Sequence, residues 1–291
     1  MGEFCIKFSI LLVTTSLIWL ASHLLMNEVV NTKSAEGALF IWGDSQVYRG
    51  FDLNLAKKES SLNIFSAARQ GAGVYDFLNF VSLVPDGSSV IIAPSIPSIL
   101  SSKNRDYNLT GLNFFALKKL FENDYSFSSL WEIIVKNQRP RPLFTNVGAL
   151  YKNTENLQLR NTTAQMKLAL EAKDNPTEDK VSLYKIGLNA LIMKKCTISI
   201  VHFPVHPKLH ECLVPYPQFK NLSAFYKSLP TIIGSYISDT LIFPCPKNHM
   251  KDLTHLNKRG ATIATSETFN KSKINQPRII TFLVNECDTI E

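Results

Sequence analysis

The chain has 291 residues, of which 45% are hydrophobic and 19% are charged. These proportions are typical of a globular protein and exclude an intrinsically disordered chain, and the length allows one domain of about 200–250 residues with an appendage. The net charge of +7 comes from basic residues that are scattered along the chain. Without a basic and aromatic stretch, the sequence does not favour nucleic acid as a partner.

The chain begins with a nearly continuous apolar segment. Residues 8–26 contain no charged side chain and are long enough to cross the hydrocarbon core of a bilayer as a helix. A cleaved signal peptide would have a shorter apolar region and small residues before the cut, whereas Ala-Ser-His at residues 21–23 is a poor cleavage site. We therefore expect a single-pass signal anchor and stalk at residues 1–34, followed by one domain at residues 35–291.

The rest of the chain alternates short apolar runs with helix-like segments, which predicts an α/β fold with a mainly parallel sheet. Strands are expected at residues 39–42, 62–65, 90–93, 197–203 and 240–243, with a further edge strand at 277–283. Helices are expected from residue 45 into 53–56, and at 75–83, 177–195, 222–236 and 261–269. Residues 103–176 interrupt this alternation and are expected to form an inserted helical lid or cap.

The first expected strand ends in a serine. Leu39 to Trp42 is followed by Gly-Asp-Ser45, which is turn chemistry at the carboxyl end of a strand, where the active sites of open α/β sheets collect. Such a serine is a nucleophile only if a base accepts its proton. Near the other end of the chain, Asp252 and His255 stand three residues apart. Spacing alone would favour a strand-end serine, a helix-capping aspartate and an unrelated histidine.

The early Gly-Asp-Ser45 and the late Asp252-x-x-His255-Leu-Asn together resemble the SGNH/GDSL family of esterases and acyltransferases. The resemblance covers residues 39–95 and 197–265. It implies a three-layer α/β/α fold similar to flavodoxin-like folds. It also implies that Ser45 attacks an acyl carbonyl, that His255 accepts its proton, and that Asp252 fixes the imidazole tautomer.

The resemblance further implies an oxyanion hole. The family uses the backbone N–H of the nucleophile, here Ser45, a glycine after the second strand, here Gly71, and an asparagine in a Gly-x-Asn-Asp block after the third. The corresponding block here is Ala-Pro-Ser-Ile at residues 93–96, so Ser95 is the expected substitute. Losing one such donor lowers turnover by about 10²–10³-fold. A similar loosening occurs in membrane-anchored relatives, including the D-alanyl-transfer protein of teichoic acid assembly.

Three further residues are candidates for substrate binding. Arg49 is expected either to form an ion pair with Asp52 at a helix start or to bind an anionic group of the substrate near Ser45. His206 follows the fourth expected strand and His249 precedes the Asp-x-x-His segment, so both are candidates for the wall of the cleft.

The remaining histidines and the cysteines give weaker indications. His202, His206 and His210 are four residues apart, but Pro204 and Pro207 exclude the helix on which this spacing would form a metal site. No metal and no organic cofactor is therefore expected. Five irregularly spaced cysteines leave buried free thiols and a single disulfide equally open.

The sequence as a whole predicts a membrane-anchored serine esterase or O-acyltransferase with its domain outside the cytoplasm. The substrates would be acyl esters of an envelope glycan, lipid or polymer, and a membrane acyl-transfer partner is one source of the acyl group. The alternative is a catalytically degenerate SGNH-fold protein that binds or scaffolds envelope glycan. The missing Gly-x-Asn-Asp block favours this alternative, and the retained Ser45, Asp252 and His255 oppose it.

Overall fold

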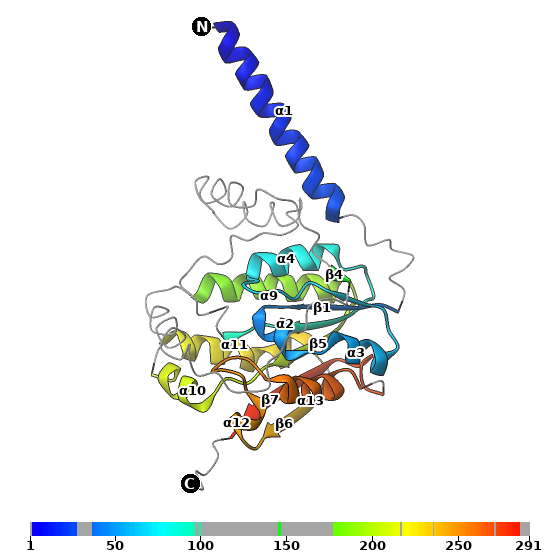
Figure 1. Cartoon of the computed structure of the whole chain (residues 1–291), viewed down its shortest axis with the longest axis vertical. Helices are drawn as coiled ribbons and strands as arrows, with labels where there is room; N and C mark the ends of the chain where they lie inside the picture. Colours follow the sequence, from blue (N-terminus) through cyan, green and yellow to red (C-terminus); the bar gives the residue numbers. More distant parts are fainter. Residues whose placement is uncertain are drawn as a thin grey trace.

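The protein has an α/β fold in which helices cover both faces of one sheet (Figure 1). The computed structural model describes residues 2–27, 37–96, 99, 145–146, 177–215, 217–234, 236–270 and 272–285. The predicted helical insertion at 103–176 therefore lies outside the described residues, apart from the two-residue strand Thr145–Asn146. The predicted division between stalk and domain at residues 34 and 35 lies outside them as well.

The sheet has the strand order β4-β2-β1-β3-β5-β7-β6. All neighbouring strands are parallel except β4, which pairs with β2 in the antiparallel direction. The strands are β1 Leu39–Gly43, β2 Ile64–Ser66, β3 Ser89–Ala93, β4 Thr145–Asn146, β5 Thr197–His202, β6 Ile237–Phe243 and β7 Arg278–Val284. This arrangement confirms the predicted α/β class and the mainly parallel sheet.

Strand β1 lies inside the sheet, and all five of its residues are buried. Phe40 and Trp42 belong to the core on one face, whereas Leu39 and Ile41 belong to the core on the other. A strand of a parallel sheet that is covered on both faces reads as a continuous apolar run, because its alternate side chains both meet helices. This explains why the run before Gly43 shows no polar alternation.

The helices divide between the two faces according to the core that they join. Helices α4 Val74–Leu83, α9 Thr177–Met193 and α11 Pro217–Ile233 pack on one face. Helices α2 Ser45–Gly50, α3 Leu53–Ser60 and α13 Lys258–Thr268 pack on the other face. Two short helices, α10 Pro207–Leu213 and α12 Pro246–His249, follow β5 and β6. Both begin with a proline, which suits the first turn of a helix because its missing N–H would be unpaired there.

The structure corrects two of the expected elements. Strand β7, expected at an edge, pairs with both β5 and β6, and β6 is the outer strand. The exposures agree with this order, because the side chains of β7 are mostly buried and those of β6 are mostly exposed or half-buried. The helix expected to run from residue 45 into 53–56 is two helices, because Phe51 and Asp52 adopt extended backbone and Asp52 caps α3.

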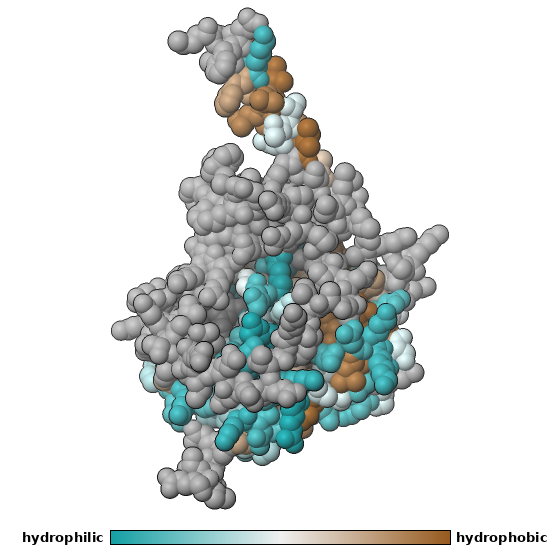
Figure 2. All heavy atoms as spheres, in the orientation of Figure 1, coloured by the Kyte–Doolittle hydropathy of each residue, from teal (hydrophilic) through white to brown (hydrophobic). Residues whose placement is uncertain are grey.

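The N-terminal helix α1, Gly2–Asn27, carries exposed apolar side chains along its described part (Figure 2). Among the residues that the structure describes, no helix combines the length and the apolar character needed to cross a membrane. The predicted signal anchor is therefore not confirmed. The sequence left free thiols and a disulfide equally open for the cysteines. Among the described cysteines, Cys245 is disulfide-bonded, whereas Cys196 and Cys212 are free thiols.

Candidate active site

The turn after β1 places Ser45 at the carboxyl edge of the sheet. Asp44 is the N-cap of α2, and its Oδ1 accepts a 2.8 Å hydrogen bond from the backbone N–H of Gln46. Helix α2 turns back so closely over β1 that a Cβ on Gly43 would lie 2.0 Å from Cγ2 of Val47. This close approach requires a glycine at residue 43. Ser45 directly follows the capping Asp44 and is the first residue of α2.

The segment that carries the acid and the base is a short, firmly anchored loop. Met250 and Leu256 form an antiparallel bridge across it, and Leu253 and Leu256 are buried. Asn257 then caps α13, because its side chain accepts a 2.9 Å hydrogen bond from the N–H of Gly260. The bridge at one end and the cap at the other hold residues 251–255 in a single arrangement.

The structure brings Ser45, His255 and Asp252 together. Oγ of Ser45 lies 2.9 Å from Nε2 of His255, inside the 2.6–3.5 Å range expected for a nucleophile and its base. Nδ1 of His255 lies 2.8 Å from each carboxylate oxygen of Asp252. Because a carboxylate accepts the Nδ1 proton, Nε2 is left as the acceptor that faces the serine. The side chains of His255 and Asp252 are only 12% and 13% exposed.

The carboxylate of Asp252 is itself held in place by its own loop. Its Oδ1 accepts hydrogen bonds of 2.9 Å from the backbone N–H groups of Thr254 and His255, and one of 3.2 Å from the Thr254 hydroxyl. These donors stabilise the ionised carboxylate and fix its direction. The three-residue spacing of Asp252 and His255 therefore builds a pair that depends on local backbone contacts.

Gln46 connects this loop to the nucleophile, and the sequence analysis missed it. Its buried side chain donates from Nε2 to the carbonyl oxygen of Thr254 at 2.8 Å, and a longer contact of 3.5 Å reaches the carbonyl of Pro204. The backbone N–H of His206 also donates to the carbonyl of Leu253 at 2.8 Å. No sequence pattern indicates these contacts, because they join segments about 50, 160 and 200 residues apart.

The backbone amides of Ser45 and Gly71, expected in the oxyanion hole, have no acceptor within the protein among the described residues. The loop that carries Gly71 runs beside the end of β1, because the N–H of Arg69 donates to the carbonyl of Gly43 at 3.2 Å. Gly71 has a φ of +73°, a conformation that other residues rarely adopt, so the loop requires glycine there.

Ser95 was expected as a donor in the oxyanion hole, but its side chain binds Asp44. Its hydroxyl donates to Oδ2 of Asp44, so its proton points to a carboxylate and not to a bound substrate. Asp44 is buried, and burial raises its pKa, whereas the hydrogen bonds from Ser95 and Gln46 and the nearby His255 act in the opposite direction. Asp44 was also missed as a site residue, although an aspartate directly before a helix is a recognised capping signal.

The three candidate substrate-binding residues lie at different places. Arg49 lies near Lys251, whose pKa is lowered by burial and by the charge of Arg49. His206 is buried and caps α10, accepting at Nδ1 from the N–H of Lys208. His249 is buried in a stack on Phe243, and its Nδ1 donates to a backbone carbonyl at 3.0 Å. Both histidines thus have structural partners, and His249 has almost no surface that a substrate can contact.

The comparisons with known proteins assign no family to this chain. The chain matches no protein-family model, and no curated protein matches it. In the described residues there is no group of three or more histidine, cysteine and carboxylate side chains placed to hold a metal ion.

Proposed function

We propose that this protein is an SGNH-type serine esterase or O-acyltransferase. The observation that carries the proposal is the continuous chain of contacts from Ser45 Oγ through both nitrogens of His255 to Asp252. These residues come from opposite ends of the chain, so their meeting is not explained by local structure. The α/β fold with helices on both faces and the Gly-Asp-Ser and Asp-x-x-His-Leu-Asn segments support the same family.

The first half of the reaction acylates the serine. Ser45 Oγ attacks the acyl carbonyl carbon while its proton passes to Nε2 of His255, and Asp252 stabilises the imidazolium that forms. In this proposal the oxyanion of the tetrahedral intermediate accepts hydrogen bonds from the amides of Ser45 and Gly71. The bond between the carbonyl carbon and the leaving oxygen then breaks, and His255 returns the proton to the leaving alcohol.

The second half removes the acyl group from Ser45. A water molecule or an acceptor hydroxyl gives its proton to His255 and attacks the acyl-enzyme, and Ser45 regains a proton as the new product leaves. Water gives hydrolysis, whereas an acceptor hydroxyl gives acyl transfer. Because the hydroxyl of Ser95 is held by Asp44 and is not free to act as a third donor, we expect slow turnover.

We also propose that the domain, residues 35–291, works outside the cytoplasm on acyl esters of an envelope glycan, lipid or polymer. The disulfide at Cys245 supports an oxidising compartment, since disulfides are rare in reducing ones. Anchoring through residues 8–26 and acyl supply by a membrane acyl-transfer partner remain part of the proposal. An N-terminal sequence of the mature protein that begins after residue 26 would rule out the anchor.

Replacing the nucleophile tests the proposed activity. Ser45→Ala is expected to abolish hydrolysis of 4-nitrophenyl acetate and labelling by a fluorophosphonate probe, and His255→Ala is expected to lower both nearly as far, because the residues act as a unit. Ser182→Ala, an exposed serine on α9, is the matched control and should behave as wild type. If wild type is neither labelled nor active but binds envelope glycan as well as Ser45→Ala does, the scaffold alternative holds.

A further inference from the structure

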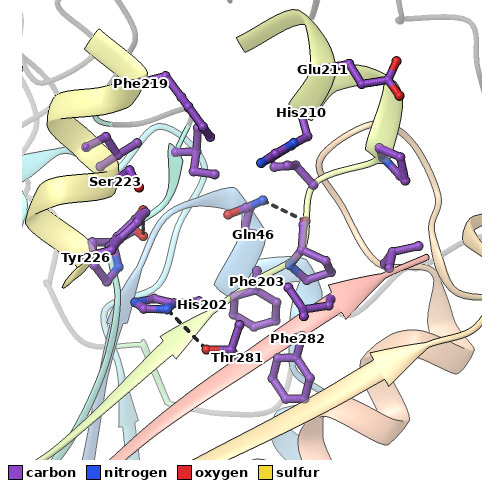
Figure 3. Close-up of a pocket in the computed structure, with 18 of the residues that line it drawn as sticks. Gln46, His202, Phe203, His210, Glu211, Phe219, Ser223, Tyr226, Thr281 and Phe282 are labelled. Carbon is purple, nitrogen blue, oxygen red and sulfur yellow. Dashed lines mark hydrogen bonds between the residues drawn. The ribbon is translucent and has the colours of Figure 1, made fainter. Parts of the chain in front are cut away.

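The candidate active site has two sides, the base on one and the oxyanion donors on the other. On the side of the base, the side chain of Gln46 reaches from α2 to the carbonyl oxygen of Pro204, at the edge of a cavity of about 560 Å³ (Figure 3). Gly71 does not line this cavity, and Gln46 makes no hydrogen bond to it. The direction of the Gly71 amide therefore depends on other residues.

Gly71 lies at the third position of a tight turn after β2. The N–H of Ala72 donates to the carbonyl of Arg69 at 3.4 Å, which closes the turn over Gln70 and Gly71. Gly71 has a φ of +73° and Gln70 has no positive φ, which is the pattern of a type II turn. Types I and II differ by a flip of the central peptide, and the N–H of that peptide belongs to Gly71. The turn type therefore decides to which side of the loop this amide points.

One buried carboxylate holds both ends of the turn. Oδ2 of Asp76, in the first turn of α4, accepts a 3.0 Å hydrogen bond from the N–H of Gly73, and Oδ1 accepts from the guanidinium of Arg69. The side chain of Asp76 is 1% exposed, and that of Arg69 is 22% exposed. Because Arg69 precedes Gly71 by two residues and Gly73 follows it by two, Asp76 closes the loop on both sides of Gly71.

The contact with Gly73 alone would be ordinary helix capping. An acidic residue at the third position of a helix accepts the N–H of the cap residue and faces the positive end of the helix dipole. Capping does not explain the contact with Arg69, which lies outside α4 and belongs to the turn. The backbone N–H of Arg69 also donates to the carbonyl of Gly43 at 3.2 Å, two residues before Ser45. The carboxylate, the turn and the end of β1 therefore form one connected unit.

From these observations we infer that Asp76 is a positioning residue of the oxyanion hole: by binding Arg69 and the Gly73 amide, it keeps the turn in type II and the Gly71 N–H directed at the oxyanion. This inference rests on the proposed acyl-transfer function. Gly71 is half-buried, so a substrate has access to its amide, whereas Asp76 is buried and acts only through the turn.

Replacing the carboxylate tests this role in the full-length protein. Asp76→Asn keeps the size of the side chain and an acceptor for the Gly73 N–H, but it loses the charge that binds Arg69. Hydrolysis of 4-nitrophenyl acetate is measured per site that a fluorophosphonate labels at completion, so unfolded protein is not counted. We expect kcat to fall about 10–100-fold with little change in KM, because the complete loss of one oxyanion donor lowers turnover by about 10²–10³-fold.

A second variant breaks the same pair from its partly exposed side. Arg69→Gln should give a loss similar to that of Asp76→Asn, and the double variant should lose no more than either single variant, because the two side chains act as a unit. Should Asp76→Asn fail to fold, the result for Arg69→Gln decides.

A transition-state analogue separates a displaced oxyanion donor from a general disturbance of the fold. Phenylboronic acid bonds to Ser45 Oγ as a tetrahedral anion, and its inhibition constant should rise by the same factor by which kcat/KM falls. Asp239→Asn is the matched control, since it removes the charge from another carboxylate that binds an arginine, Arg278, at the outer strand β6. It should leave kcat and the inhibition constant unchanged.

The possible failures are distinguishable. Wild-type kcat per site in Asp76→Asn and Arg69→Gln would overturn the role of Asp76 and leave the esterase intact. A fall in kcat with unchanged inhibition by phenylboronic acid, or an equal loss in Asp239→Asn, would overturn it too, because the effect would then not come from the oxyanion donor. If wild type is neither labelled nor active on the ester, the proposed function fails, and the role of Asp76 in catalysis fails with it.

Discussion

His202, at the carboxyl end of β5, should make the stability of the protein depend on pH, because its ring nitrogen Nε2 is buried and makes no hydrogen bond. Burial lowers the pKa of His202 from 6.5 to about 4. As the pH falls below 6.5 the unfolded chain binds a proton at this residue and the folded protein does not, so the free energy of unfolding decreases. The loss is complete near pH 4. At 1.36 kcal/mol for each pH unit, the difference amounts to about 3 kcal/mol.

The measurement compares wild type with His202→Leu in urea unfolding at several pH values from 7.5 to 4. All other titratable groups are shared by the two proteins, so the difference between their curves isolates His202. We expect the difference to be constant above pH 6.5 and to shift by about 3 kcal/mol in favour of the variant by pH 4. Parallel curves over the whole range would show that His202 is protonated as easily in the folded protein as in the unfolded chain, and would refute the reasoning.

Three further substitutions test the supports of the site and of the sheet. Gln46→Leu removes the tether to the catalytic loop, and we expect ester hydrolysis to fall about 10–100-fold, with fluorophosphonate labelling slowed in parallel; unchanged rates would show that the loop holds itself. Gly43→Ala would place a methyl group against Val47, and we expect urea unfolding to show a loss of about 1–3 kcal/mol. Asp239→Asn weakens the contact of Asp239 with the buried Arg278, and we expect a loss of about 1–2 kcal/mol at pH 7. Because hydrogen bonds from Arg278 and Lys273 lower the pKa of Asp239 despite its burial, that loss should disappear as the pH falls below 3.8; a loss that persists at pH 2 would contradict it.

Several features were predictable because they depend on residues that are close in sequence. The apolar run before Gly43 indicates a strand buried on both faces, and the same pattern located β3 and β5. The turn at Asp44 and Ser45 follows from an aspartate that caps the next helix. The Asp252–His255 pair is equally local, since its bonds are made within one loop of four residues. Such contacts need no partner from another part of the chain, so a short stretch of sequence is enough to predict them.

Other features were decided only by the tertiary structure. Ser45 meets His255 across 210 positions of the chain, and their spacing in sequence carries no information on that distance. The same holds for Gln46 on the carbonyl of Thr254 and for Ser95, whose hydroxyl is taken by Asp44 and withdrawn from the expected oxyanion hole. The place of β7 inside the sheet is of this kind too, since an apolar strand can pair with either neighbour until the whole sheet packs. Sequence patterns report local backbone preference and burial, whereas these partners are chosen by the packing of segments far apart in the chain.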